Sequence, residues 1–390
     1  MPEDYDFDAA IVHPDRVREI RLFNLKRLQL QGLASATRTQ EQFPALIHLL
    51  LGYTAYTDHS IVALPDGFLG GSAPRLQCLL LASIPFPALP KLLLSATQLV
   101  RLILHYIPHS GYFSPKVIVT PLAVMPNLEF LVIEFKSPLS RPHRESRRPP
   151  PQIRTVLPAL TRFQFKGASE FLEDFVSRID TPLLDSIDII FFHQLIFDIP
   201  QLAQFMGRST RSQEHKEAHM GFYNGEIYVV THPLGGSLFP EKARVGISCE
   251  ALDWQLSSLA QVFTLFFPFI YTVEHLYIYK PQVPQTQRQV DIENMQWFEI
   301  FHPFTAVKNL YLSKQLVPSI APALQELVGG RTAEVLPILQ NIHLEGLQPS
   351  ERIEEGILKF VGSRQLSNHP ITVSRWQRDS DSGTVSEFGD

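Results

Sequence analysis

Hydrophobic positions along this chain recur in one short phrase. Residues 74–81 read P-x-L-x-x-L-x-L: a turn leads to one anchoring leucine, and two further leucines then alternate with other residues. Alternation at period 2 is what a half-buried β-strand requires. The same phrase begins again at Pro44, Pro126 and Pro158. The pattern therefore predicts a series of similar strands, each preceded by a turn.

The spacing of the phrase indicates a repeat architecture. Its first apolar residues, taken as anchors, are Val17, Leu46, Leu76, Leu99, Leu128, Leu160, Leu184, Val273, Val307 and Leu339. Outside the long interval after Leu184, consecutive anchors lie 23 to 34 residues apart. We expect weaker strands at Met220-x-Phe222 and Val245-x-Ile247 to divide that interval into three periods, and a last strand at Ile371-x-Val373. A period of this size, with one strand and one helix or turn per unit, is that of leucine-rich repeats.

The segments between the strands carry helical patterns. We expect helices at 170–180, from Pro200 onward, at 254–263 and from about Ser350, because apolar residues recur there at helical spacing. The asparagine that normally follows the phrase is absent after Leu81 and Leu104, so other groups must satisfy the turn backbone. The predicted fold is α/β. It is an irregular leucine-rich-repeat solenoid of about 12 repeats, with a curved parallel sheet and with helices and turns on its convex side.

The domain organisation follows from where the repeat holds. We predict one solenoid over residues 16–376, an acidic N-terminal extension over 1–15 and a disordered acidic tail over 377–390. A basic, proline-rich loop at 137–154 and an irregular insert at 207–245 interrupt the solenoid. A hairpin is expected inside the insert, at Glu226 to Thr231, and the polar His215 to His219 stretch is expected to be a loop.

Composition and charge narrow the function class. Apolar residues make up 45% of the chain and charged residues 19%, which indicates extensive burial. The formal net charge of −5 gives no general attraction to nucleic acid or membranes. Two cysteines exclude a disulfide scaffold, and the longest apolar run is broken by Pro268. With an acidic N-terminus unlike a signal peptide, the chain is expected to be intracellular, cytoplasmic or nuclear, with no membrane partner.

Several long strings resemble a known family. They include Ala63 to Leu76 (ALPDGFLGGSAPRL), Ile107 to Tyr112 (IPHSGY), Phe191 to Gln194 (FFHQ), Asp253 to Ser258 (DWQLSS) and His302 to Leu312 (HPFTAVKNLYL), with Asn368 to Ile371 (NHPI) at the end. The chain resembles, over about residues 15–378, the F-box-like proteins with degenerate leucine-rich repeats of mushroom-forming fungi. The resemblance implies a substrate-recruiting part of a cullin-type ubiquitin ligase receptor. Docking to the ligase adaptor would require an F-box, which this sequence lacks.

Catalytic and metal-binding motifs are weak throughout. His215 and His219 are spaced i and i+4, but Lys216 stands where a zinc protease motif needs glutamate. Gly329-Gly330-Arg331-Thr332 does not match a phosphate-binding loop, and we expect a helix C-terminus there. We therefore predict that the chain is not an enzyme and that it has no catalytic, cofactor-binding or metal-binding residues.

The repeat phase predicts a binding surface. The residue between the last two leucines of each phrase should face the concave side, and after Arg21 these positions are Leu50, Leu80, Ile103, Val132, Gln164, Asp188, Tyr277, Tyr311 and His343. The first four of these nine form an apolar stripe, which either binds a partner protein or is covered from within. Tyr277 and Tyr311 should stand side by side, as suits a protein interface.

The arginine-rich loop supports a second hypothesis. It contains Arg141, Arg144, Arg147, Arg148 and Arg154 against Glu145 alone. The first hypothesis is a non-enzymatic solenoid that binds an unidentified protein. The alternative is that this loop binds nucleic acid or another acidic partner. Nucleic acid is the less favoured partner, because no aromatic residues interleave with the arginines for base stacking.

Overall fold

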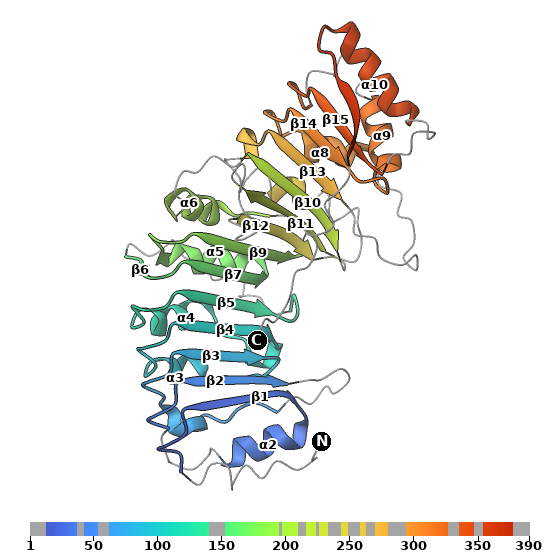
Figure 1. Ribbon diagram of the computed structural model, residues 1–390. Helices are drawn as coiled ribbons and strands as arrows, with labels where there is room; N and C mark the ends of the chain where they lie inside the picture. Colours follow the sequence, from blue (N-terminus) through green and yellow to red (C-terminus); the bar gives the residue numbers. More distant parts are fainter. Residues whose placement is uncertain are drawn as a thin grey trace. The chain divides into compact units, whose positions relative to one another are not determined.

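The computed structural model describes residues 13–36, 43–53, 62–139, 153–194, 197–209, 216–223, 226–232, 243–248, 258–262, 270–279, 294–326, 335–346 and 354–376. Contacts divide the chain into two units. The first contains residues 1–192 and 198–211, and the second contains residues 193–197 and 212–390. Each unit is built on strands that carry helices on one side (Figure 1). The opposite side of each sheet is here called its open face.

Unit 1 contains a run of parallel strands in sequence order. They are β1 (Glu19–Leu25), β2 (His48–Tyr53), β3 (Cys78–Ala82), β4 (Arg101–Ile107), β5 (Phe130–Phe135), β7 (Arg162–Gly167) and β9 (Ser186–Phe192). Every neighbouring pair is parallel, with Leu79, Leu102, Leu131, Phe163 and Ile187 in one register. These five side chains are buried. The repeat phase predicted from the sequence is confirmed in this unit.

The helices of unit 1 pack against the side of its strands that carries the buried leucines and phenylalanines. They are α2 (Arg27–Ala36), α3 (Leu89–Leu93), α4 (Pro115–Leu122), α5 (Ser169–Ser177) and α6 (Pro200–Ser209), with short 3-10 turns η1 (Phe68–Gly71) and η2 (His109–Gly111). Phe171 of α5 lies 4.8 Å from Phe135 and 5.7 Å from Phe165 between ring centroids. The Glu173 carboxylate accepts bonds from the backbone N–H groups of Gln201 and Leu202, at 3.0 and 2.7 Å, which caps α6. A small ladder joins β6 (Thr155–Val156) to β8 (Ile179–Asp180).

Unit 2 combines an antiparallel meander with a second parallel run. The meander contains β10 (Glu217–Tyr223), β11 (Glu226–His232) and β12 (Ala243–Ser248), and both of its pairings are antiparallel. Next to β10 follow β13 (His275–Tyr279), β14 (Asn309–Leu312), β15 (Asn341–Glu345) and β16 (Thr372–Trp376), all parallel. The helical elements are η4 (Ile270–Thr272), α8 (Asn294–Phe301), α9 (Val317–Glu326) and α10 (Glu355–Leu366), and residues 258–262 are also helical.

The meander corrects the sequence prediction for the long interval. Met220-x-Phe222 and Val245-x-Ile247 do lie in strands, but these strands are not successive parallel repeats. In the sheet they run in the reverse order, β12-β11-β10, before β13. Tyr223 pairs directly with Glu226, and such a short connection can join only antiparallel neighbours. Glu226 to Thr231, expected to be a hairpin, is a single strand, and the hairpin connection precedes it.

Backbone hydrogen bonds between neighbouring repeats take the place of the missing asparagine at the strand ends. Ser83, after β3, and Gly346, after β15, adopt positive φ values of 59° and 64°. Their backbone N–H groups donate to the carbonyls of His105 and Trp376 on the next strand, at 2.9 and 3.2 Å. The Ser313 N–H likewise donates to the Ile278 carbonyl at 2.9 Å. The backbone donors are therefore satisfied by strand-to-strand bonds rather than by an asparagine side chain.

Candidate functional site

The open face of unit 1 carries the first part of the predicted surface. The register places in one row Arg21, Leu50, Leu80, Ile103, Val132, Gln164 and Asp188. The structure thus brings together all of the unit 1 positions that the repeat phase selected. Leu50, Leu80, Ile103 and Val132 are hereafter called the apolar stripe.

The apolar stripe is largely buried. Val132 is 0% exposed, Ile103 7% and Leu80 8%, and Leu50, Ala82 and Phe130 pack against them with partial exposure. They form a hydrophobic cluster on the open face, separate from the core beneath the helices. These open-face side chains bury one another, so little of the apolar area of the stripe reaches the surface. Leu50 is the half-exposed member.

Polar groups border the stripe on both sides. His105 Nδ1 lies 2.8 Å from the Glu134 carboxylate, and the Arg101 guanidinium lies 5.3 Å from the centre of the Phe130 ring. Burial raises the pKa of the Cys78 thiol, and Arg101 lowers it by a smaller amount. A thiol with a raised pKa is a poor nucleophile, so this border offers no reactive cysteine.

The open face of unit 2 carries a row of stacked rings, here called the ring row. It consists of His219, Tyr277, Tyr311 and His343, which are paired across β10, β13, β14 and β15. Ring centroids are 4.4 Å apart for His219 and Tyr277, 4.1 Å for Tyr277 and Tyr311, and 4.3 Å for Tyr311 and His343. The planes of successive rings differ by 6°, 11° and 10°. The predicted neighbours Tyr277 and Tyr311 do stand side by side.

Strand geometry explains why these rings stack. Neighbouring strands lie about 4.8 Å apart, so identical register positions place planar side chains at nearly the thickness of an aromatic stack. Tyr277, Tyr311 and His343 occupy the same phase of their repeats, and β10 adds His219 because it pairs in parallel with β13. All four rings are half-buried, so they are both fixed by their neighbours and open to a partner.

A second row of polar side chains runs beside the first and is here called the amide row. It consists of His275, Asn309 and Asn341 on β13, β14 and β15. Asn341 Nδ2 donates to Asn309 Oδ1 at 2.8 Å, and Asn309 Nδ2 lies 3.3 Å from His275 Nδ1. An asparagine NH₂ group that faces His275 Nδ1 makes that nitrogen the acceptor. The internal bonds use the Asn309 carbonyl and the His275 ring nitrogen as acceptors.

A charged cluster closes the end of the amide row. Glu274 accepts hydrogen bonds from Lys216 Nζ at 2.8 Å and from Lys308 Nζ at 2.7 Å. The bonds from Lys216 and Lys308 lower the pKa of Glu274 to about 2. Glu274 thus bridges the two lysines, which precede β10 and β14 as Glu274 precedes β13.

Aromatic side chains from flanking strands enclose the ring row. The Trp376 ring centroid lies 5.4 Å from that of Tyr311, edge to face, and 5.8 Å from that of Tyr277. On the other side, the Arg244 guanidinium lies 4.6 Å from the centre of the Tyr228 ring. Tyr228 also crosses Gly221, where a Cβ atom would come within 2.5 Å of the tyrosine ring. Gly221 therefore gives Tyr228 the room to bring its hydroxyl to 3.4 Å from that of Tyr279.

Burial shapes the protonation of the ring row. It raises the pKa of Tyr277, and the nearby Tyr311 and Glu217 act in the same direction. Burial also lowers the pKa of His343, with a further contribution from His275, while Ser374 Oγ lies 2.7 Å from His343 Nδ1. Tyr277 is thus a neutral hydroxyl at physiological pH, and the neutral form of His343 is favoured. The row offers hydrogen bonds rather than a fixed charge.

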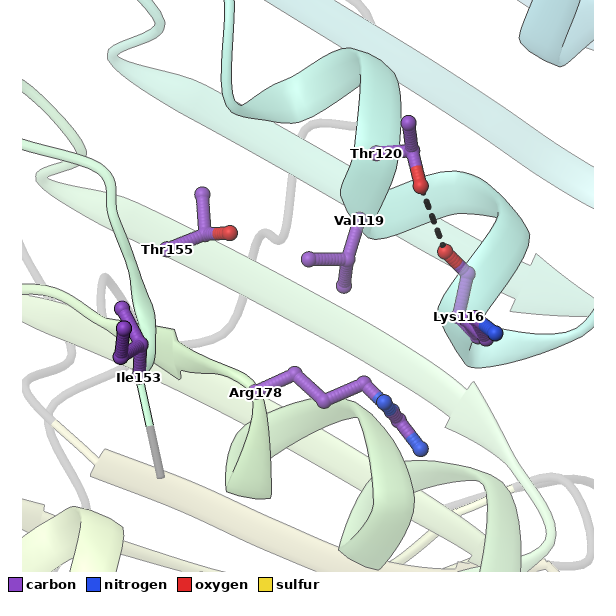
Figure 2. Close-up of a pocket in the computed structure, with 6 residues that line it drawn as sticks. All are labelled: Lys116, Val119, Thr120, Ile153, Thr155 and Arg178. Carbon is purple, nitrogen blue, oxygen red and sulfur yellow. Dashed lines mark hydrogen bonds between the residues drawn. The ribbon is translucent and has the colours of Figure 1, made fainter. Parts of the chain in front are cut away.

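The helix side of unit 1 has a small open depression of about 170 Å³. Figure 2 shows its lining residues, Lys116, Val119, Thr120, Ile153, Thr155 and Arg178. Arg178 is bound to Asp174 Oδ1 through Nε and Nη2, at 3.0 and 2.7 Å, and the Thr120 hydroxyl donates to the Lys116 carbonyl at 3.1 Å. The arginine that lines the depression is therefore neutralised by a carboxylate of α5.

The arginine-rich loop lies mostly outside the described residues. Arg141, Arg144, Arg147 and Arg148 belong to that part, whereas Arg154 is described. Arg154 Nε donates to the Ser177 carbonyl at the end of α5, at 3.3 Å. Arg101 and Arg162 instead share the phase of the open-face residues in β4 and β7. Arg154 thus lies on the helix side, away from the basic residues of the open face.

Within the described ranges, no three His, Cys, Asp or Glu side chains are grouped to hold a metal ion. No described helix is long and apolar enough to cross a membrane. The two histidines of the i, i+4 motif are not both described: His215 is outside, and His219 is on β10 rather than in a polar loop. Gly329 to Thr332 also lie outside the described residues.

Sequence reasoning missed three contributors to the unit 2 surface. The polar composition of 215–219 favours a loop and conceals His219, although Ala218, Met220 and Phe222 alternate with it and predict a strand. Trp376 was missed because it reaches the ring row across β15, and no periodic pattern records such a reach. Asn341 was missed because it lies one alternation before His343, outside the position used to select the surface.

Comparisons with known proteins give little further information. No protein-family model matches the sequence, and no curated protein matches it. Among solved structures, the leucine-rich repeat-containing protein LegL7 from Legionella pneumophila aligns with 91% of this chain and 98% of its own. The two are 13% identical, with a TM-score of 0.32. The assignment to an irregular leucine-rich-repeat solenoid therefore rests on this chain's own parallel strands, repeat register and one-sided helices.

Proposed function

We propose that this chain is a non-enzymatic protein-interaction solenoid that docks a partner protein on the open face of unit 2. The observation that carries the proposal is the ring row, in which four half-buried rings on consecutive strands stack at 4.1 to 4.4 Å. Aromatic residues held rigidly lose little conformational entropy on binding, which is why they are enriched at the centres of interfaces.

The row of unit 1 that contains the apolar stripe is proposed to have only a secondary role in docking. Because three of its four members are buried, it presents little apolar area to a partner. Leu50, Gln164 and Asp188 remain half-buried on the same row and are proposed as peripheral contacts. We accordingly propose Tyr277, Tyr311 and His343 as the main recognition surface.

The wider role is proposed from the family resemblance. In that role the solenoid recruits the substrate of a cullin-type ubiquitin ligase, inside the cell. Contact with the ligase adaptor requires an F-box elsewhere in the full protein. Nucleic-acid binding through the arginine-rich loop is less favoured, because Arg154 hydrogen-bonds the end of α5 and shares no face with Arg101 and Arg162.

Affinity purification with chemical cross-linking tests the docking proposal. Wild type is compared with Tyr277→Ala/Tyr311→Ala and with Thr372→Trp, which adds bulk at an exposed position beside Asn341. Tyr271→Ala, at a 47% exposed tyrosine in η4, is the matched control. We expect a stoichiometric partner retained by wild type and by the control but lost from both other variants. A purified partner that binds all four proteins equally would overturn the proposal. Thermal melts confirm that each variant is folded.

A further inference from the structure

The indole of Trp376 has one face against the ring row and one face turned away from it. Its ring centroid lies 5.4 Å from that of Tyr311, with the planes at 66°, and 5.8 Å from that of Tyr277. Both faces of Tyr311 are occupied, by Tyr277 at 4.1 Å and by His343 at 4.3 Å. The edge of Tyr311 therefore points at a face of the indole, as in other edge-to-face pairs. Among the described residues, no ring other than the two tyrosines contacts the indole, so its outer face has no aromatic partner.

An unpaired carboxylate lies beside this indole. Glu345 follows His343 at period 2 on β15, so it projects from the open face, and it pairs in register with Trp376. Both side chains are half-buried and thus open to a partner. In the part of the chain that the structure describes, the Glu345 carboxylate forms no hydrogen bond or ion pair. An indole face attracts cations through its ring quadrupole, and a carboxylate attracts them by its charge.

The two lysines beside the amide row lie at the far end of the strands from Glu345. Both are bound to Glu274, Lys216 at 2.8 Å and Lys308 at 2.7 Å. Glu274 and Lys308 immediately precede β13 and β14, whereas Glu345 is the last residue of β15. These strands are parallel, so their first and last residues lie at opposite ends of the sheet. The lysines therefore leave Glu345 without a counter-charge.

Three other described cations of unit 2 also leave Glu345 unpaired. Arg375 pairs in register with the buried Leu344, so it projects toward the helix side rather than the open face. Arg244 is on β12, and β11, β10, β13 and β14 stand between that strand and β15. Lys314 follows β14, and it forms no ion pair with Glu345. A cation from outside the chain can therefore reach the Glu345 carboxylate without displacing a described partner.

We propose that Glu345 and Trp376 bind an arginine side chain of the partner protein. A guanidinium is planar, so it stacks on the outer indole face while its N–H groups donate to the neighbouring carboxylate. A lysine ammonium is a compact point charge and lacks this planar fork. Glu217 and Glu226, on β10 and β11, add two further carboxylates to the open face that a basic segment would cross. The inference rests on the proposed docking function and gives the chemistry of one contact within it.

Selection from a random peptide display library tests the inference. The full chain serves as bait, and counter-selection against Tyr277→Ala/Tyr311→Ala removes peptides that bind away from the ring row. We expect the recovered peptides to be enriched in arginine. They are synthesised with a fluorescent label, together with a matched set in which citrulline, of similar shape but uncharged, replaces the arginine. By anisotropy the citrulline peptides should bind wild type about 10-fold more weakly, because hydrogen bonds between charged groups are the stronger ones.

Two variants of the protein locate the arginine. Glu345→Gln removes the charge with little change of shape, and Trp376→Leu removes the aromatic face. The arginine peptides should bind each variant about 5-fold or more weakly than wild type. Glu345→Gln should also bind the arginine and citrulline peptides nearly equally. Glu299→Gln, at an exposed carboxylate of α8, is the matched control and should leave the affinity unchanged. Thermal melts verify that each variant is folded.

Several results would overturn the inference. They are recovered peptides without arginine, no peptide surviving counter-selection, equal affinities of the arginine and citrulline peptides for wild type, and equal binding by wild type and Glu345→Gln. A cellular partner that is lost from Tyr277→Ala/Tyr311→Ala but retained by Glu345→Gln would leave the docking proposal standing in that event.

Discussion

Tyr277 and Tyr311 lie in register on adjacent parallel strands, and their rings stack with centroids 4.1 Å apart and planes 11° from parallel. Neither side chain belongs to the hydrophobic core, yet each is held by neighbours on both sides. The fold thereby provides a rigid aromatic surface outside its core. Binding to such a rigid surface costs little conformational entropy, and the proposed function depends on this property.

A double-mutant cycle measures the stacking of this pair. We expect the Tyr277→Leu and Tyr311→Leu changes to be coupled by about 0.5–1.5 kcal/mol in the free energy of unfolding, as direct aromatic pairs are. Urea denaturation of both single variants, the double variant and wild type gives the coupling. A parallel cycle between Tyr311 and Tyr271, which lies off the ring row, should be additive. Additivity in both cycles would contradict the stacked arrangement.

The core ladder of unit 1 predicts a large cost for truncation at Leu131. This side chain is 0% exposed and sits in register with Leu102 and Phe163. Leu131→Ala should lower the free energy of unfolding by about 2–5 kcal/mol through lost burial and the cavity left behind. Leu366→Ala, at a residue 91% exposed, is the control and should be nearly neutral. Equal melting temperatures for the two variants would place Leu131 outside the core.

Burial of the apolar stripe makes charged substitutions there destabilising. Leu80 and Ile103 are 8% and 7% exposed, so carboxylates at both positions lose their hydration without gaining a partner. Leu80→Asp with Ile103→Asp should cost roughly 3 kcal/mol or more of unfolding free energy. Leu50→Asp, at the half-exposed member, should cost clearly less. An unchanged circular dichroism melt for the double variant would show that the stripe is exposed.

The Glu274 cluster predicts a dependence of stability on pH. Bonds from Lys216 and Lys308 hold the folded-state pKa of Glu274 at about 2, below the ordinary value of 4.5. A carboxyl whose pKa is depressed on folding stabilises the protein above pH 4.5, and the contribution fades as pH falls toward 2. Glu274→Gln should therefore destabilise at pH 7 by about 1 kcal/mol, as partly exposed ion pairs do. The difference from wild type should shrink at pH 3. A constant difference across this range would show that the ion pairs do not contribute.

Most of the parallel ladder could be predicted from the sequence because the same position of each phrase must be apolar and buried. Leu79, Leu102 and Leu131 each need a buried position at period 2, and that pattern needs no knowledge of the rest of the chain. The same phase placed Tyr277 and Tyr311 together. Local alternation was therefore sufficient to predict the strands and their register wherever consecutive strands run parallel.

Prediction failed where the topology is not periodic. The strand that contains Met220, β10, pairs with β13, although β11 and β12 lie between them in the sequence. Spacing alone indicates regular parallel repeats over this interval. His219 could have been recovered by extending the Ala218, Met220 and Phe222 alternation. Trp376 could not have been, because its contact with Tyr311 depends on the direction of one long side chain from the edge strand.

The central claim is tested most directly by isothermal titration calorimetry at matched pH and salt. The measured quantity is the affinity of the purified partner for wild type and for Tyr277→Ala/Tyr311→Ala. Docking on the ring row predicts binding at least about 10-fold weaker for the double variant, since aromatic anchors at the centre of an interface carry much of its affinity. It also predicts an unchanged affinity for Tyr271→Ala. Equal affinities for wild type and a folded double variant would contradict the claim that the ring row is the docking surface.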